Sequence, residues 1–290
     1  MTSSSARSAS EVKLVLKRLS ELPTLPAALY RMLDVLSDPK LSMAAISKII
    51  AEDPSLTSKM LKLANSPYYG FQKEVRSVDH AMVLLGVETV KALALGVSIF
   101  NTFHDSVNMN GIDKAGLWAH FLAVAFCSRE FSLIMNSVEP NSAFTGGLIH
   151  DIGRLALLRM FPSESVLVVG QTEQGGCSLL DAERDIYGID HEEAGAFLAK
   201  TWGLPEDLQE AIAFHHDMSA FEKTELVHAV YMAERLCKLL ELGWTGEPKP
   251  DDMRDEELRA AGIDRAQLDE VRDRILAREP EIKEFLKRLW

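Results

Sequence analysis

Residues 142–160 read SAFTGGLIHDIGRLALLRM, a stretch in which apolar residues recur at the three- and four-residue spacing of a buried helix. This spacing predicts one helix from Ser142 to Met160. Two adjacent polar residues, His150 and Asp151, interrupt the apolar stretch near its centre. Because burying an unpaired carboxylate is costly, we expect a metal ion, another cation or a hydrogen-bond network to accompany this pair.

The same helical spacing runs through most of the chain, whereas the alternating pattern of strands is scarce. Proline, glycine and capping residues mark where the expected helices begin and end. The expected helices cover residues 14–19, 27–36, 43–51, 54–65, 78–85, 87–103, 112–135, 142–160, 191–203, a segment starting at 206, and 225–240. The sequence therefore predicts an all-α fold, a bundle of many helices.

The composition is that of an ordinary globular protein, with 290 residues, 47% of them hydrophobic and 26% charged. A formal net charge of -12 argues against general nucleic-acid binding, which needs a concentrated positive surface. Three distant cysteines without a CxxC pair indicate neither a disulfide framework nor a zinc ribbon. The N-terminus lacks a secretory signal, and no window approaches the roughly 20 apolar residues of a membrane span. We therefore expect a cytoplasmic protein without a membrane partner, and a poorly ordered tail over residues 1–10, MTSSSARSAS.

Two segments leave a structural and a functional interpretation open. Residues 65–70, NSPYYG, form a turn cluster whose Tyr68 and Tyr69 are expected to pack over the helices, or else to form a partner surface. The last forty residues are about half charged but keep apolar residues at helical spacing. They are expected to form amphipathic helices packed on the main body, with a separate partner-binding arm as the alternative.

Further polar candidates lie near or within other expected helices. They are His120, His191, His215, His216 and Glu234. Imidazoles and carboxylates are the ligands that Zn, Mn or Fe need, and adjacent metal ions can share one bridging carboxylate. Each residue alone has a simpler explanation, because a single histidine on an apolar helix is usually a hydrogen-bonded core residue. Spacing alone therefore leaves metal binding and a structural network as open alternatives.

Four ordered blocks of sequence carry a family resemblance. They are Leu22–Pro26 (LPTLP), Glu52–Leu56 (EDPSL), Leu63–Gly70 (LANSPYYG) and Ala81–Gly86 (AMVLLG). From about residue 15 to about residue 242 the chain resembles the HDOD family. The resemblance implies a bacterial, all-helical domain related to the HD phosphohydrolases and generally regarded as regulatory, without demonstrated hydrolase activity.

The resemblance also implies a domain organisation. Residues 11–242 would form the HDOD domain, with an N-terminal helical lobe over about 11–105 and an HD-like lobe over about 106–242. Residues 243–250 would form a linker, and the charged amphipathic helices would occupy the remainder up to residue 290.

A more distant resemblance, to the HD and HD-GYP phosphodiesterases, unites the polar candidates in one site. The metal-ligand positions of those families fall on His120, His150, Asp151, His191, His215, His216 and Glu234, the last in place of an aspartate. The resemblance implies one or two divalent ions of Fe, Mn or Zn. We therefore expect His120, His150, Asp151 and at least one of the others to converge in one pocket.

Three departures concern the parts that handle substrate in those enzymes. Arg154 stands in place of the lysine that follows the His–Asp pair, and it keeps the charge but not the compact ammonium geometry. Gly116 occupies the position of a further carboxylate, and residues 217–221 replace the GYP segment. The ligand positions are thus kept, while the neighbouring substrate-handling positions differ.

The sequence supports three functional hypotheses. The favoured one is a non-catalytic regulatory module that relays a signal to other signalling proteins through helix packing, with or without bound metal. A nucleotide ligand and homodimer formation are left open. The alternative is a metal-dependent phosphohydrolase acting on a nucleotide or cyclic dinucleotide, in which Asp151 would help hold the metals and Arg154 would stabilise phosphate charge. DNA binding by residues 43–64 is disfavoured, because the second helix there carries only Lys59 and Lys62 as cations. We expect metal binding with weak or absent hydrolysis.

Overall fold

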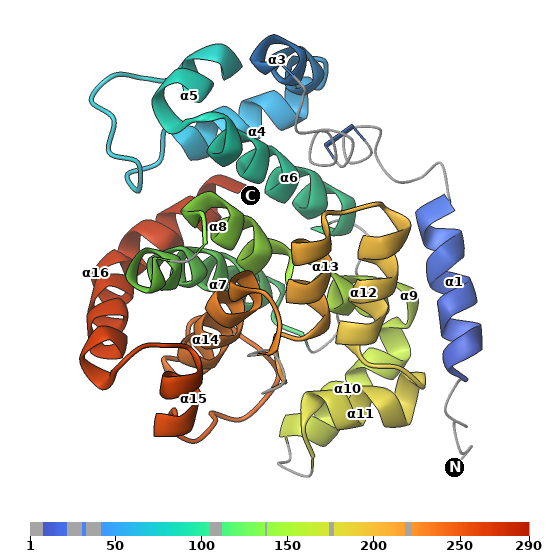
Figure 1. The fold of residues 1–290 in the computed structure, drawn as a ribbon. Helices are drawn as coiled ribbons and strands as arrows, with labels where there is room; N and C mark the ends of the chain where they lie inside the picture. Colours follow the sequence, from blue (N-terminus) through green and yellow to red (C-terminus); the bar gives the residue numbers. More distant parts are fainter. Residues whose placement is uncertain are drawn as a thin grey trace.

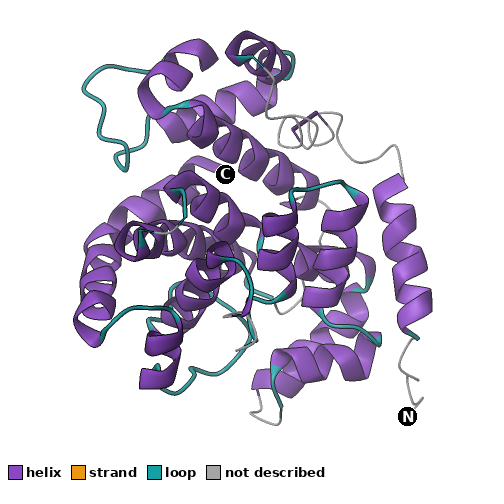
Figure 2. Ribbon diagram, in the orientation of Figure 1, coloured by secondary structure: helices purple, strands orange, loops and turns teal. Residues whose placement is uncertain are grey.

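The computed structural model describes residues 8–21, 31–32, 42–104, 112–136, 138–173, 177–217 and 222–289, and these contain helices but no strand (Figure 2). The all-α prediction is confirmed. Residues 1–7 of the expected tail, the Leu22–Pro26 block and most of the expected helix over 27–36 lie outside the described residues. Ala9 and Ser10 were expected in the tail but belong to the first helix, because Ser8 and Glu11 bond reciprocally at its start.

The helices follow one another along the chain in the order shown in Figure 1. They are α1 (Ala9–Glu21), α3 (Met43–Ala51), α4 (Pro54–Ala64), α5 (Val78–Leu85), α6 (Val87–His104), α7 (Lys114–Met135), α8 (Pro140–Ile149), α9 (Ile152–Met160), α10 (Pro162–Glu173), α11 (Leu179–Tyr187), α12 (His191–Thr201), α13 (Glu206–Ala213), α14 (Glu225–Leu239), α15 (Asp255–Ala260) and α16 (Arg265–Leu289). Helices α10 and α11 were not anticipated from the sequence.

Helix α7 is the central helix of the larger group, where it packs against α8, α14 and α16 (Figure 1). Most of its apolar side chains, among them Phe121, Phe126 and Phe131, are almost completely buried. Within the described residues it is the one helix long and apolar enough to cross a membrane, yet 78% of its apolar window is buried inside the protein. Such burial is that of a core helix.

Helices α3, α4, α5 and α6 form a smaller group, and α6 joins it to the rest by packing on α8 (Figure 1). In this group Lys59 of α4 donates a hydrogen bond to Asn101 and lies over the Phe100 ring. Because Lys59 points into the protein, α4 packs on α6 and does not offer this cation to a nucleic acid.

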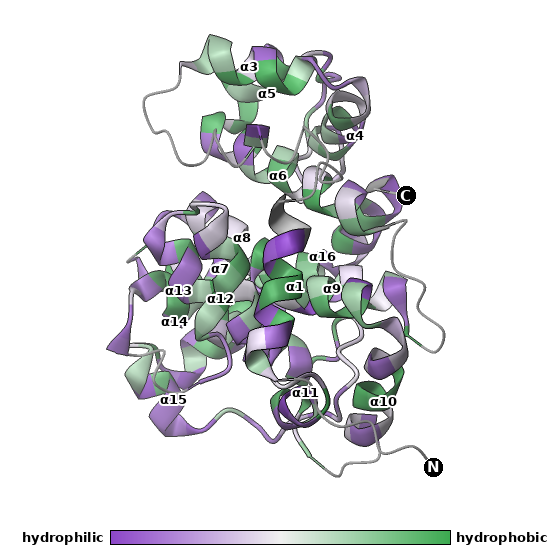
Figure 3. Ribbon diagram, turned by 90° about the vertical axis from the view of Figure 1, so that its right-hand side faces the viewer, coloured by the Kyte–Doolittle hydropathy of each residue, from purple (hydrophilic) through white to green (hydrophobic). Residues whose placement is uncertain are grey.

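The C-terminal helices pack on the main body, as expected. Helix α16 contacts both α7 and α4, and its residues Val271, Ile275 and Phe285 are buried. Figure 3 shows the corresponding pattern over the described residues, with hydrophobic stretches where helices meet and hydrophilic ones on outer turns such as those of α15.

The turn after α4 is held by one amide side chain. Asn65 donates to the carbonyl oxygens of Leu61 and Val75, at 2.8 Å each, and accepts from the backbone N–H of Val75 at 2.7 Å. Tyr68 then packs on Phe126 of α7, with ring centroids 4.2 Å apart and the ring planes tilted by 44°. The expected packing of this turn over the helices is therefore observed.

The stretch over residues 142–160 does not form the single helix that its spacing predicts. Helix α8 ends at Ile149, and α9 starts at Ile152 after Asp151 has left the helical conformation with φ -98° and ψ 22°. The spacing was misleading because both helices are buried on nearly all sides, so the apolar pattern does not change where the chain bends. At this bend the Asp151 side chain lies in the protein interior, where it is 3% exposed.

Two glycines on either side of this bend allow neighbouring helices to come unusually close. A Cβ atom at Gly147 would lie 2.8 Å from Ala125 Cα on α7. A Cβ atom at Gly153 would lie 2.0 Å from the carbonyl oxygen of His191 on α12. Both distances are shorter than van der Waals contact permits, so only glycine fits, and the bend is held against α7 and α12.

We predict that Gly153→Ala destabilises the protein by about 1–3 kcal/mol or more, because the added methyl group must push α9 away from α12. Thermal and chemical denaturation measure the effect. Gly170→Ala in α10 is the matched control, since a Cβ atom there would meet nothing within 4 Å. This control should be neutral or stabilising by up to about 1 kcal/mol. Equal stability of Gly153→Ala and the unmodified chain would contradict the close helix contact.

Candidate metal centre

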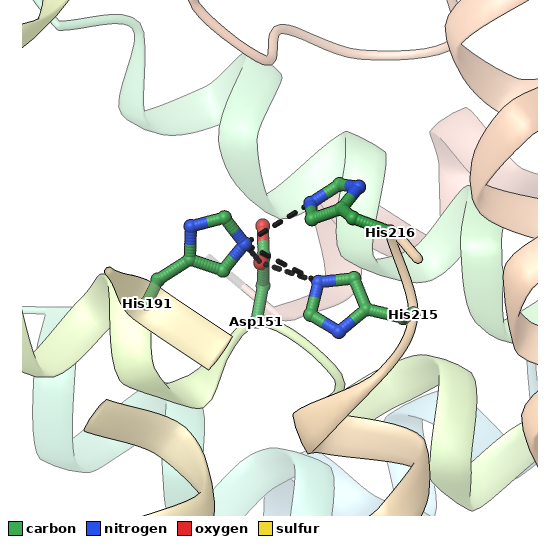
Figure 4. Close-up of side chains that lie close together, drawn as sticks. All are labelled: Asp151, His191, His215 and His216. Atoms are coloured by element: carbon green, nitrogen blue, oxygen red, sulfur yellow. Dashed lines mark hydrogen bonds and ion pairs between the residues drawn. The ribbon is translucent and has the colours of Figure 1, made fainter. Parts of the chain in front are cut away.

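Four of the predicted residues gather at the bend between α8 and α9 (Figure 4). Asp151 lies in the bend, His191 is the first residue of α12, and His215 and His216 follow α13. His191 Nε2 lies 3.2 Å from Asp151 Oδ1, 3.3 Å from His215 Nε2 and 3.0 Å from His216 Nε2. His215 Nε2 is 3.4 Å from Asp151 Oδ1. Three helices thus direct four potential ligands to one point.

The other three predicted residues form a second group next to the first. His120 comes from the middle of α7, His150 from the end of α8 and Glu234 from α14. Glu234 Oε2 lies 2.8 Å from His120 Nε2 and 3.5 Å from His150 Nε2. All three side chains are at most 2% exposed.

Asp151 links the two groups. Its Oδ1 atom faces His191 and His215, while its Oδ2 atom lies 3.7 Å from His150 Nε2 in the second group. One carboxylate placed between two clusters of imidazoles is the arrangement by which adjacent metal ions share a bridging ligand. The expected convergence of His120, His150 and Asp151 with the later histidines and Glu234 is therefore observed.

The spacing of these atoms suits ligation of a common ion. Ligand atoms about 2.1 Å from one shared ion lie about 3.0–3.4 Å from one another in octahedral or tetrahedral geometry. The separations within the first group, 3.0–3.4 Å, match this range. Moreover, His120 Nε2, His150 Nε2, Asp151 Oδ1 and Glu234 Oε2 are buried and, despite these short separations, none makes a hydrogen bond of good geometry among the described residues. Buried polar atoms that lack a partner and point at shared space fit a divalent ion.

The outer nitrogens of three histidines are held by acceptors. His191 Nδ1 lies 2.6 Å from Glu183 Oε2, His150 Nδ1 2.7 Å from the carbonyl oxygen of Gly147, and His215 Nδ1 3.0 Å from that of Ile212. Because an acceptor at Nδ1 places the proton there, each neutral ring directs the lone pair of Nε2 inward. Lone pairs that face one another repel unless a cation or a proton lies between them, and this arrangement is typical of metal-binding histidines.

Glu183 is a functional candidate that the sequence analysis missed. It lies on α11 with Leu179, Ala182 and Tyr187, at the three- and four-residue spacing of the buried face of that helix. A glutamate on an otherwise apolar helix face, eight residues before a candidate histidine, was a signal that could have identified it. Glu183 also accepts from the backbone N–H of His191 at 2.8 Å, so it fixes both the ring and the start of α12.

Two cations accompany the carboxylates of the centre. Arg154 Nη1 lies 3.5 Å from Asp151 Oδ2, and Lys238 Nζ lies 3.0 Å from Glu234 Oε1. Burial alone would raise the pKa of both carboxyl groups, but nearby positive charge has the larger combined effect. His150 and His191 hold the pKa of Asp151 well below its usual range, and His120 and Lys238 do the same for Glu234. Both carboxylates are therefore ionised and available as ligands at neutral pH.

With this geometry established, comparison with known families identifies the class of protein. The model of the HDOD domain family matches residues 22–218, so the chain belongs to the HDOD family. An "Uncharacterized protein" of Treponema pallidum (strain Nichols) is 25% identical over 240 residues, covering 77% of this chain and 44% of the relative. The chain thus spans less than half the length of that curated relative.

Two solved structures cover nearly the whole chain. A "Putative phosphohydrolase" from Shewanella amazonensis SB2B is 27% identical, with a TM-score of 0.76 and coverage of 98% of this chain and 99% of its own. An HDOD domain protein with unknown function from Geobacter sulfurreducens is 26% identical, with a TM-score of 0.77 and coverage of 97% and 99%. The fold described above, including the C-terminal helices, is therefore shared with these proteins.

We predict that Glu183→Gln weakens metal binding about tenfold or more, because the substitution removes the charge that orients and polarises His191. Competition of the bound metal with a chelator measures the affinity. Asp185→Asn on the same helix is the control, since Asp185 is exposed and its substitution changes the net charge equally. An unchanged affinity in Glu183→Gln would show that Glu183 supports α12 without tuning the ligand.

Proposed function

We propose that this chain is a regulatory HDOD module that binds one or two divalent ions in a closed centre and does not hydrolyse phosphodiesters. Its ligands would be the seven residues described above, with Asp151 shared between the two groups. A bound ion would supply the positive charge that holds α7, α8, α9, α12 and α14 together around one point. Anything that binds only the folded state stabilises it by mass action, so metal occupancy and the packing of these helices would be coupled.

The observation that supports a closed centre is the path of residues 243–247, here called the covering segment. It follows α14 and crosses α7, where the backbone N–H of Trp244 donates to the carbonyl oxygen of Gly116 at 2.8 Å. The carbonyl oxygens of Thr245 and Gly246 then accept hydrogen bonds from Arg154 and Thr172. The sequence analysis expected a linker over residues 243–250, but the covering segment is bonded to the body of the protein.

Glu247 fastens the end of the covering segment. Its carboxylate pairs with Lys238 and accepts from the backbone N–H of Leu179 at 3.1 Å. Lys238 in turn contacts Glu234, so a continuous chain of charges runs from the covering segment to a predicted ligand. Lys238 lies four residues after Glu234 on α14 and is 12% exposed, which makes this chain of contacts largely buried.

The covering segment engages two of the positions where the sequence departs from the hydrolases it resembles. A Cβ atom at Gly116 would lie 2.6 Å from Trp244 Cβ, so a carboxylate side chain could not be accommodated there without moving Trp244. The Arg154 guanidinium donates to the covering segment and lies 5.5 Å from the Trp244 ring centroid, so its contacts are already made by residues of this chain. A phosphodiester would have to displace these contacts before it could reach the ligands.

The alternative function, a metal-dependent phosphohydrolase, is favoured by one observation. Arg154 Nη1 lies 3.5 Å from Asp151 Oδ2, which is close enough for a guanidinium to contact a phosphate held beside that carboxylate. Hydrolysis would then require release of the covering segment.

We predict that protein purified without an affinity tag contains about one or two divalent ions per chain and cleaves neither a bis-aryl phosphodiester nor a cyclic dinucleotide above the rate of free metal. Elemental analysis and product assays with Mn, Fe or Zn measure the two properties. Asp151→Ala should lose metal and metal-dependent thermal stabilisation, because its carboxylate contacts both groups. At metal concentrations 100-fold above the dissociation constant, that stabilisation is about 2.7 kcal/mol.

His80→Ala is the control, since His80 lies on α5 and belongs to neither ligand group. Protein that stays metal-free after reconstitution would contradict the metal-binding part of the proposal. Rapid cleavage that Asp151→Ala abolishes, while the variant stays folded, would replace the regulatory proposal with the phosphohydrolase.

A further inference from the structure

A cavity of about 330 Å³ lies at a junction that the metal centre does not use. Its walls come from the turn after α4, the end of α5, and helices α6, α7, α8 and α16. These elements belong to the smaller helical group, the central core and the C-terminal helix, which meet here (Figure 1). None of the seven candidate metal ligands lines the cavity.

One wall of the cavity is aromatic and rigidly placed. Tyr68 and Tyr69 meet edge to face with ring centroids 5.0 Å apart, and Tyr69 lies parallel to Phe71 at 6.3 Å. Tyr68 is fixed from below by Phe126 at 4.2 Å. Because these rings are already packed against one another, they can contact a planar ligand without a large loss of side-chain freedom on binding.

Two guanidinium groups, those of Arg129 and Arg278, also line the cavity, and that of Arg278 lies over the Tyr68 ring at 5.1 Å from its centroid. Glu130, whose side chain is 5% exposed, holds them in place: Oε1 lies 3.6 Å from Arg129 Nη1 and 3.7 Å from Arg278 Nη1. The same carboxylate contacts Arg274 through Oε2 at 3.2 Å, and Arg274 also pairs with Glu270. Three arginines against two glutamates leave an excess of one positive charge, in a chain whose net charge is -12.

We infer that this cavity binds a small aromatic anion, specifically a mononucleotide, with its base against the tyrosine turn and its phosphate between Arg129 and Arg278. Guanidinium groups match the geometry of phosphate oxygens and bind them by paired, charge-assisted hydrogen bonds. Planar bases stack on aromatic side chains irrespective of base identity. Thr89 and Asn141 also line the cavity, and their neutral polar groups can orient the sugar or the edge of the base by hydrogen bonds.

The size of the cavity selects among nucleotides. Small-molecule sites have volumes of about 300–1,000 Å³, and this cavity lies near the lower limit of that range. A ligand with one base and one phosphate therefore fits its dimensions better than a cyclic dinucleotide, which carries two of each. The cavity also gives the Leu63–Gly70 block a second role, since that block supplies both the turn and two of its aromatic rings.

The test is titration calorimetry on the full chain with adenosine 5′-monophosphate, guanosine 5′-monophosphate, phenyl phosphate, benzoate and inorganic phosphate. We expect a nucleoside monophosphate to bind at least about tenfold more tightly than inorganic phosphate, because stacking of the base adds to the phosphate contacts. Arg129→Gln and Arg278→Gln should each weaken its binding about 10- to 100-fold, the effect of removing a charge-assisted hydrogen bond.

Arg272→Gln is the matched control, because Arg272 lies on the same helix as Arg278 and both side chains are 41% exposed. If either arginine variant unfolds, Leu84→Trp replaces it as the test. Leu84 lines the cavity and is 42% exposed, and because it is uncharged its substitution leaves the ion pairs of the arginines in place. The larger ring should fill the cavity and prevent binding while the melting temperature is kept.

Several outcomes would overturn the inference. They are a lack of binding by both mononucleotides at millimolar concentration, equal binding of inorganic phosphate and the mononucleotides, and preference for benzoate over them. Binding that survives Leu84→Trp but is lost in Asp151→Ala would place the nucleotide at the metal centre instead. That last result would change the proposed function, because the metal centre would then be the nucleotide site. If instead only the cavity variants fail to alter binding, the inference about the cavity is wrong and the proposed metal centre is unaffected.

Discussion

The structure depends on the burial of one carboxylate, that of Asp151, at a bend between two apolar helices. A carboxylate that is 3% exposed must be compensated by positive charge or hydrogen-bond donors, since an uncompensated one would oppose folding strongly. Compensation comes from every side: His191 and His215 face one oxygen, and His150 and Arg154 face the other. Because these groups come from α8, α9, α12 and the end of α13, satisfying Asp151 fixes the relative positions of four elements.

Much of this arrangement could be predicted from the sequence. Helix ends followed local chemistry, as at Asp190 and Glu193, which form a capping box at the start of α12. The ligand candidates could be found because imidazoles and carboxylates are conspicuous on apolar helices, although their spacing alone left a structural network as an alternative to metal binding. The resemblance to HD proteins then supplied which of them belong together. Metal binding itself stays a prediction, and the partner, the localisation and the boundaries of the two lobes do too.

What the sequence could not provide depends on contacts between distant segments. The bend at Asp151 escaped detection because apolar spacing is the same in one buried helix and in two. The covering segment contains Gly243 and Gly246 and had the composition of a linker, yet it is fastened by Arg154 and Thr172, which are 91 and 74 residues away from their partners. Lys238 was not among the candidates from the sequence, because one of its two partners, Glu247, lies on the covering segment. The local sequence pattern predicts which face of a helix is buried, but it does not predict which loop covers which site.

The metal centre and the arginine-lined cavity are joined by two continuous helices. Helix α7 places His120 in the centre and Arg129 at the cavity, nine residues or about 14 Å further along its axis. Helix α8 carries Asn141 at the cavity and ends beside His150 in the centre. The two helices pack closely through Gly147, which gives a route by which a displacement of one at the cavity would reach the other near the centre. If an anion and a metal ion bind these places, a shift in packing that favours one must change the affinity for the other by the same factor. A module without turnover could in this way convert ligand binding at its surface into a change of helix packing around its interior.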